Sequence, residues 1–131
     1  MVIDASAAID MLIPTPTGAR IADFLLGLNS DLQVPSHFRI ECTSALRALT
    51  LRSRISDDRA AASLKDLIAL GCTVWPDELV LDRVWQLRHS VSAYDAAYLA
   101  LAEVLDATLV TSDRRFARAA QVAGQAPIVV F

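Results

Sequence analysis

The stretch VIDASAAI at residues 2–9 joins strand-forming residues to a helix-forming run through a single aspartate. Val2 and Ile3 are β-branched and typical of strands, whereas Asp4 is costly to bury unless it has a partner. One interpretation is that Asp4 caps a helix that begins near Ala5, because aspartate is a favoured N-cap residue. The other is that Asp4 stands at the end of a buried strand to do chemistry. The second interpretation requires other reactive residues to meet Asp4 in the fold.

The same change from a short apolar run to a longer helical stretch repeats along the chain. Strands are expected at residues 2–4, 32–35, 72–75, 108–111 and 128–131, and helices at residues 5–12, 17–28, 36–54, 56–70, 77–89, 92–105 and 113–123. Gly71 and Gly124 come just before two of the strands, where glycine commonly ends a helix. Alternating strands and helices predict an α/β fold of three layers, α/β/α, around a mostly parallel five-stranded sheet. A plain flavodoxin-like sheet is the alternative.

Length and composition indicate one domain, residues 1–131, large enough to bury its own core. A hydrophobic content of 54% is high for a soluble chain of this size, so we expect a partner or a second subunit to cover part of the surface. The apolar run AAYLALA at 96–102 is far shorter than the ~20 residues that cross a bilayer. No basic, apolar and small-residue pattern of a signal peptide opens the sequence. We therefore expect a cytoplasmic protein.

The charge balance argues against a broad basic surface for nucleic acid. The formal net charge is −3, and Lys65 is the only lysine among twelve lysine and arginine residues. If four carboxylates are set aside as metal ligands, however, the balance becomes +1. Cys42 and Cys72 are too few and too far apart in sequence for a zinc knuckle or a disulfide framework. Both cysteines are interpreted as small buried hydrophobic residues.

Four acidic residues occupy positions that surface acids rarely take. Asp4 and Asp113 each follow an expected strand, and open parallel sheets bind ligands beyond the carboxyl ends of their strands. Glu41 lies at the edge of the apolar stripe of helix 36–54, and Asp95 shares a face with apolar residues in a helix that is apolar nearly all round. If the first and fourth strands are neighbours, acids from both halves of the chain converge.

Each acid also has a structural explanation. Ser92 and Asp95 have the spacing of a capping box, and Asp113 can cap the last helix. Taken together, however, the acids need compensation, because two carboxylates 4 Å apart repel by about 4 kcal/mol at an effective dielectric constant of 20. No lysine lies nearby, so the cluster requires a divalent cation or bound protons. Carboxylate oxygens suit Mg²⁺ or Mn²⁺, which serve the hydrolysis of phosphodiesters.

Four motifs now carry a family resemblance. They are DAS at 4–6, HFRIE at 37–41, SAYDAAYLALA at 92–102 and LVTSDRRF at 109–116. In this order, across essentially the whole chain, they resemble the motifs of PIN-domain nucleases, most closely the VapC toxins of toxin–antitoxin pairs. The resemblance implies a Mg²⁺-dependent endoribonuclease, with Mn²⁺ as a substitute, that cleaves cellular tRNA or rRNA and is neutralised by a cognate VapB-like antitoxin. It also implies a homodimer and an antitoxin groove, for which helix 17–28 is a plausible wall through Ile21, Phe24, Leu25 and Leu28.

The resemblance assigns roles to individual residues. Asp4, Glu41, Asp95 and Asp113 match the acidic quartet, with Asp4 and Asp95 as the direct metal ligands. Glu41 and Asp113 are expected to orient the attacking water, hold metal-bound waters or help to bind a second ion. The remaining matches are hydroxyl residues expected to hydrogen-bond the carboxylates or the scissile phosphate, namely Ser6, Thr111 and Ser112. Some relatives carry a further acid just after the fourth, where Arg114 and Arg115 stand here, so one or two ions remain possible.

Weaker signals have competing interpretations. His37 and Glu41 have the spacing of a zinc-binding pair on a helix, but no second histidine or cysteine ligand is evident. Arg39, Arg114, Arg115 and Arg118 either bind RNA phosphates or decorate a solvated surface. The aromatic residues Tyr94, Tyr98, Trp75 and Trp85 are expected in the core or a subunit contact, although the two tyrosines could stack on bases. His89 is expected to be a helix cap or a surface group.

Other functions fit the sequence less well. A receiver domain would show paired acids after the first strand and a late lysine, and an aspartyl-phosphate phosphatase would show D-x-D. Ser6 stands where these enzymes need an acid, and Lys65 lies within an expected helix. A PIN nuclease of RNA processing that is not a toxin stays open. So does a PIN-like binding module without catalysis, which would be marked by loss of an acid, whereas all four acids are present.

Overall fold

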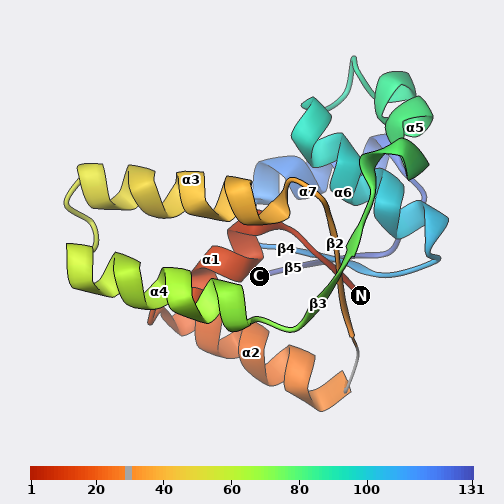
Figure 1. The fold of residues 1–131 in the computed structure, drawn as a ribbon. Coiled ribbons are helices and arrows are strands. Elements are labelled where there is room, and N and C mark those ends of the chain that lie inside the picture. The colour runs from red at the N-terminus through yellow and green to blue at the C-terminus, as the bar shows by residue number, and fades with distance from the viewer. Residues whose placement is uncertain (29–30) are drawn as a thin grey trace.

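The computed structural model describes residues 1–28 and 31–131 and contains one five-stranded sheet in which every neighbouring pair is parallel. The strands are β1 (Val2–Ile3), β2 (Leu32–Pro35), β3 (Cys72–Trp75), β4 (Leu109–Thr111) and β5 (Ile128–Val130). Their order is β3-β2-β1-β4-β5 (Figure 1). The predicted parallel sheet is confirmed. The flavodoxin-like alternative is wrong, because that fold places its third strand beside the first, whereas here β3 pairs with β2.

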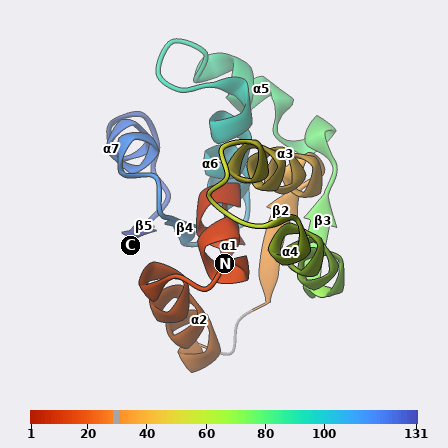
Figure 2. The same cartoon turned by 90° about the vertical axis from the view of Figure 1, so that its left-hand side faces the viewer.

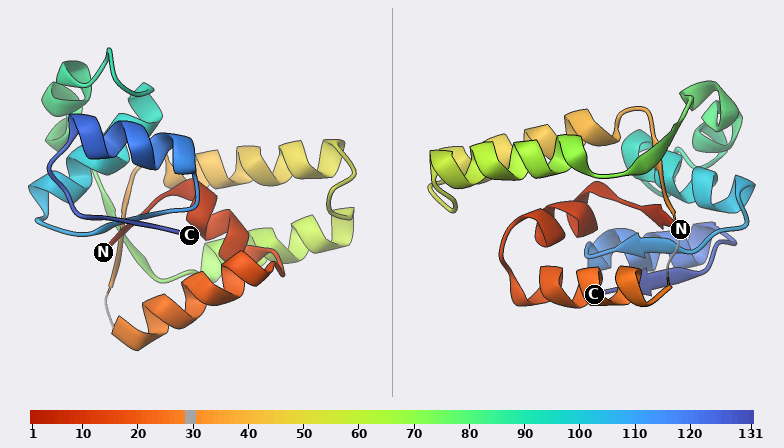
Figure 3. Two further views of the ribbon diagram at one scale, coloured as in Figure 1. Left: turned by 180° about the vertical axis from the view of Figure 1, so that it is seen from behind. Right: turned by 60° about the horizontal axis from the view of Figure 1, so that its bottom comes forward.

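Helices cover both faces of the sheet and complete the predicted three layers. They are α1 (Ala5–Leu12), α2 (Pro16–Leu28), α3 (Phe38–Leu51), α4 (Asp57–Ala69), α5 (Leu81–Gln86), α6 (Ala93–Val104) and α7 (Arg114–Ala123). Helix α7 lies on the side of β4 and β5, and helices α3 and α4 lie on the side of β2 and β3 (Figure 2). The α3–α4 pair extends beyond the sheet, as both views of Figure 3 show.

Capping side chains set the first residues of several helices. Ser56 Oγ accepts a hydrogen bond from the Arg59 N–H, and Ser92 Oγ accepts one from the Asp95 N–H. Because a capping residue keeps an extended backbone, α4 and α6 begin one residue later than predicted. The predicted helix at residues 36–54 is shorter at both ends, and Ser53 just beyond α3 has a φ of 53° in the left-handed region.

The predicted helix at residues 77–89 is wrong. The chain instead forms one turn of 3₁₀ helix, η1 (Asp77–Leu79), followed by the short helix α5. Val80 separates the two with a φ of −121°, and the residues after α5 form turns. Val80 and Leu87 are both buried, so the segment bends to follow the surface of the core, which a single straight helix would not do.

The core is centred on β1, β4 and helix α6. Every residue from 96 to 102 of α6 is buried, as its apolar composition predicts. Helix α6 contacts β1, β2 and β4, and its many alanines allow backbone and strands to approach closely. Cys42 is fully buried, as expected, whereas Cys72 is only partly buried. Among the described residues, no helix combines the length and the apolar character needed to cross a bilayer.

The four aromatic residues considered above differ in how far they are buried. Tyr98 is buried in the core and Trp75 is half-buried, donating from Nε1 to Gln33 Oε1 at 2.8 Å. Tyr94 and Trp85, however, are 63% and 69% exposed, so of the two predicted places, the core and a subunit contact, the core does not hold them. Tyr94 lies in the first turn of α6 and Trp85 near the end of α5. Periodicity alone did not show which face these two rings take.

Helix α2 is the helix expected at residues 17–28 to form one wall of an antitoxin groove. Ile21 and Leu25 face the core of the chain itself, because they are 0% and 9% exposed. Leu26, at 79% exposure, instead lines a shallow hollow of about 380 Å³ together with Leu25 and residues of α1, β2 and α4's C-terminal end. Leu25 therefore contributes both to the core and to this hollow, whereas Ile21 contributes to the core.

Candidate active site

The site begins where the order of the strands reverses. From β1 the chain moves to β2 on one side, and it later returns to place β4 on the other side of β1. Ile3 pairs with Val110, and the Asp4 N–H donates to the Val110 carbonyl at 3.0 Å. The carboxyl ends of β1 and β4 therefore lie side by side, as the sequence required for Asp4 and Asp113 to approach each other. This reversal point is where open α/β sheets bind ligands.

Asp4 is buried at this reversal point, with only 5% of its surface exposed. Its Oδ1 accepts hydrogen bonds from the Ala7 N–H at 2.9 Å and Ser6 Oγ at 2.8 Å, and its Oδ2 accepts one from Thr111 Oγ1 at 2.8 Å. Asp4 thus does cap α1. Burial nevertheless raises its pKa to about 6, outweighing these hydrogen bonds, and the charge of Glu41 adds to the rise. An exposed capping carboxylate would not have its pKa raised by burial in this way.

Hydroxyl groups tie Asp4 to the loop that follows β4. Ser6 Oγ accepts from the N–H groups of Ser112 at 3.0 Å and Asp113 at 3.1 Å, and Thr111 Oγ1 accepts from the Asp113 N–H at 3.0 Å. Ser6 and Thr111 therefore contact both the carboxylate of Asp4 and the backbone of Asp113. Ser112 contributes its backbone N–H to this network. The position of the Asp4 carboxylate is fixed from two sides.

Glu41 reaches the same region from the first turns of α3. Its side chain is 33% exposed, and its Oε2 accepts a hydrogen bond from the buried Tyr98 hydroxyl at 2.7 Å. Burial raises the pKa of Tyr98, and the Glu41 charge raises it further, so the phenol stays protonated as a donor. His37 Nε2 lies 3.6 Å from Glu41 Oε2. Glu41 also lines a hollow with Ser6 and Ser112, next to Asp4.

Asp95 and Asp113 share the neighbouring cavity, which has a volume of about 500 Å³. Ser92 Oγ accepts from the Asp95 N–H at 3.2 Å, which is the serine half of the predicted capping box, but Asp95 Oδ2 accepts from the Ser92 hydroxyl at 2.8 Å and not from its backbone N–H. Asp113 caps α7 by accepting from the N–H groups of Arg115 and Phe116. Burial raises the pKa of Asp95, and the Asp113 charge raises it further. The four acids thus form two adjacent pairs, Asp4 with Glu41 and Asp95 with Asp113.

In the part of the chain that the structure describes, no lysine or arginine neutralises these acids. Within residues 1–28 and 31–131, none of Asp4, Asp95 and Asp113 forms an ion pair with lysine or arginine. In the same ranges no three His, Cys, Asp or Glu side chains converge tightly enough to form a ready-made metal centre. The donor set nevertheless fits Mg²⁺, which binds through one or two carboxylates and keeps several waters. It does not fit zinc, since no cysteine or second histidine joins His37 and Glu41.

The arginines take different positions. Arg115 lines the cavity of Asp95 and Asp113, and Arg114 is exposed. Arg39 is half-buried and donates from Nη2 to Cys72 Sγ at 3.4 Å, towards β3. The cavity also contains Arg88 and His89, which the sequence did not single out as site residues. His89 is exposed, as expected. The sequence predicts both residues inside the helix at 77–89. Because α5 instead ends at Gln86, Arg88 and His89 lie in the turn that follows it, and this turn lines the cavity.

Comparison with known proteins shows the family to which the chain belongs. The PIN domain family model matches residues 1–122. Ribonuclease VapC12 of Mycobacterium tuberculosis is 36% identical over 118 residues, covering 90% of each chain. Ribonuclease VapC9 of the same organism is 35% identical over 130 residues, covering 99% of this chain and 97% of that one.

Two solved structures share the fold. A crystal structure of PAE2754 from Pyrobaculum aerophilum superimposes with a TM-score of 0.71 and 22% identity, covering 97% of this chain and 81% of that one. Mycobacterium tuberculosis VapC20, described as a toxin that cleaves the sarcin–ricin loop, gives a TM-score of 0.64 and 16% identity over 90% of this chain and 93% of that one. Fold, motif order and sequence identity lead to one conclusion: this chain belongs to the VapC-type ribonucleases of the PIN-domain family.

Proposed function

We propose that this chain is the toxin of a toxin–antitoxin pair, a Mg²⁺-dependent endoribonuclease that hydrolyses phosphodiester bonds in cellular tRNA or rRNA. The observation that supports the proposal best is Asp4, a buried carboxylate with a raised pKa at the reversal point of the sheet and no cationic partner among the described residues. A structural cap gains nothing from such burial. A carboxylate that binds a divalent cation does, because the cation removes the electrostatic cost.

Asp4 and Asp95 are the residues that would hold the metal directly. Ser6 and Thr111 fix the Asp4 carboxylate, and Ser92 fixes that of Asp95, so neither side chain has to be ordered when the ion binds. Mg²⁺, with Mn²⁺ as a substitute, supplies the positive charge that activates water and stabilises the developing charge on the phosphate. Because the pKa values of both acids are raised, the positive charge of a bound cation would favour their ionised forms.

Glu41 and Asp113 would act around the bound ion. Tyr98 occupies Glu41 Oε2, so Oε1 is the oxygen left to accept a proton from the attacking water. Asp113 lines the same cavity as Asp95 and would hold a water or a second ion there. Arg115 lines the same cavity, where its planar guanidinium would bind a phosphate of the RNA. Each residue therefore has a role that its position permits.

The partners proposed are a VapB-like antitoxin and a second copy of the chain, in the cytoplasm. Large apolar side chains lie exposed on several helices, among them Leu26 at 79%, Ile40 at 75% and Val122 at 90%. The names of the relatives as VapC ribonucleases support the antitoxin. Sedimentation of the chain alone, and with the product of any small gene beside its own, tests both partners. A monomer that no such product inhibits would contradict this part of the proposal.

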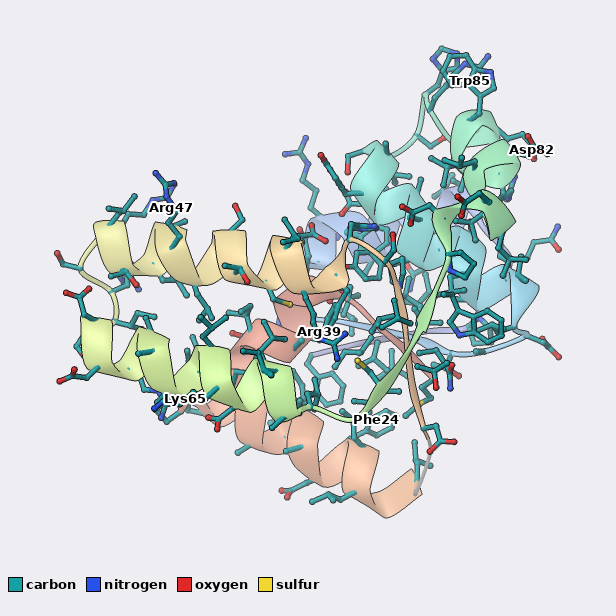
Figure 4. All side chains as sticks on the ribbon, in the orientation of Figure 1. Phe24, Arg39, Arg47, Lys65, Asp82 and Trp85 are labelled. Atoms are coloured by element: carbon teal, nitrogen blue, oxygen red, sulfur yellow. The ribbon has the colours of Figure 1, made fainter. Side chains whose placement is uncertain are left out.

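The direct test of the activity is cleavage of purified tRNA and rRNA with Mg²⁺, with Mn²⁺ and with EDTA. We expect cleavage in both metals, none in EDTA, and a loss of at least about 100-fold in Asp4→Asn and Asp95→Asn. Asp82→Asn is the matched control, because Asp82 is exposed on α5 (Figure 4) and lines neither the cavity of Asp95 and Asp113 nor the hollow of Glu41. Equal cleavage in EDTA, or by both active-site variants, would refute the proposal. No cleavage by the parent protein would favour a binding module.

A further inference from the structure

The last residues of α5 and the turns that join it to α6 form an arm, defined as residues 85–92, whose exposed Trp85 the mechanism above does not use. Trp85 projects from the arm away from the sheet (Figure 4) and is 69% exposed. The guanidinium carbon of Arg88 lies 4.9 Å from the centre of the Trp85 ring, and Arg88 Nη1 donates to the Trp85 carbonyl at 2.8 Å. Stacking and hydrogen bond together hold Arg88 in one orientation against the indole.

The base of the same arm forms a wall of the acid cavity. Residues 88–92 line this cavity together with Asp95, Asp113 and Arg115. Among the described residues, Arg88 donates a side-chain hydrogen bond to Trp85 alone and forms no ion pair. Arg88 is itself one of the residues that line this cavity, so the N–H donors that Trp85 does not use are available to a phosphate there.

The chemistry of the pair matches a nucleotide. A guanidinium presents parallel donors to two phosphate oxygens, and an exposed indole presents a flat face on which any base can stack. Exposing so large an apolar ring is unfavourable in the free protein, and the core gains nothing from it. Holding Arg88 on the ring before RNA binds also lowers the entropy lost on binding.

We propose that Trp85 and Arg88 bind one unpaired nucleotide beside the scissile bond, with Arg88 on its phosphate and Trp85 stacked on its base. This inference rests on the proposed ribonuclease function and adds a property of the substrate to it. A base paired within a helix offers no free face to Trp85. The cut is therefore expected beside an unpaired residue, in a loop or a bulge.

Steady-state cleavage of a hairpin RNA, cut in its loop, tests the pair. For Trp85→Ala and Arg88→Ala we expect KM to rise about ten-fold with little change in kcat, because the subsite contributes binding. Trp85→Phe keeps an aromatic face and should rescue most of the loss. Arg88→Ala should also lower the slope of log KM against log salt by about 0.7, the value for one phosphate contact on a single strand. Ile68→Ala and Arg47→Ala, both exposed on the α3–α4 pair, are the matched controls.

A binding measurement separates this inference from the proposed activity. The chain has two tryptophans, and Trp75 is half-buried, so quenching of the exposed Trp85 by a short unpaired RNA in EDTA reports the arm directly. Quenching that disappears in Trp85→Phe supports the proposal even if the parent protein cleaves no RNA. Active enzyme with unchanged KM, salt slope and fluorescence would overturn the arm and leave the ribonuclease intact. A change of oligomeric mass in Trp85→Ala, with KM unchanged, would assign the ring to a subunit contact instead.

Discussion

Replacement of Asp4 by asparagine is expected to stabilise the protein while abolishing its activity. Asparagine is about as good an N-cap as aspartate and can still accept the Ala7 N–H. What it removes is the buried charge. The pKa of Asp4 rises from 3.8 to about 6 on folding, and each pKa unit corresponds to about 1.36 kcal/mol, so the carboxylate costs about 3 kcal/mol of stability at neutral pH. Weaker hydrogen bonds to the neutral amide reduce the expected gain to about 1–3 kcal/mol.

The pH dependence has a definite sign. A folded-state pKa above the unfolded value means that the folded protein binds the proton more tightly, so the free energy of unfolding falls as pH rises from about 4 to about 6. The advantage of Asp4→Asn over the parent protein should therefore be full at about pH 7 and smaller by about 2 kcal/mol at about pH 4. Urea unfolding followed by circular dichroism, without divalent cations, measures both values.

The same experiment with Mg²⁺ tests the reason for the burial. A cation at 100 times its Kd adds about 2.7 kcal/mol to the parent protein and should leave Asp4→Asn unchanged, closing the gap between them. Asp82→Asn is the control, since Asp82 is exposed on α5 and lines neither acid cavity, and its effect should stay within about 0.5 kcal/mol with and without Mg²⁺. The reasoning would be refuted if Asp4→Asn were less stable than the parent protein at neutral pH. It would also be refuted if the difference in their free energies of unfolding did not change with pH.

Three further results are expected. Tyr98→Phe removes the donor to Glu41 Oε2 and should slow single-turnover cleavage about ten-fold, with a loss of about 1 kcal/mol in urea unfolding. Thr111→Val removes a hydrogen bond that favours the charged form of Asp4, so its pKa should rise and the acidic limb of the pH–rate profile should move to higher pH. Ser56→Ala deletes the cap of α4, far from the acids, and should lower stability by about 1 kcal/mol without altering cleavage.

The sequence by itself predicted the local features of the chain. The alternation of apolar runs and helical stretches predicted the strands and most helices, and Ser92 and Asp113 were identified as capping residues. The apolar character of α6 predicted its burial. These features depend on side-chain periodicity and on hydrogen bonds within a few residues, so a linear sequence contains the information. The four motifs identified the family for the same reason, because their residues stand at fixed spacings.

Only the tertiary structure decided how distant elements meet. The pairing of β1 with β4 brings Asp4 beside Asp113, and the packing of α3 and α6 adds Glu41 and Asp95. The break at Val80, the exposure of Trp85 and the position of Arg88 were equally invisible in the sequence. Local propensity acts over one or two turns of chain, whereas strand order and the face that each helix buries minimise the exposed apolar area of the whole domain. The sequence therefore determined which groups were available, and the packed sheet determined which of them share a cavity.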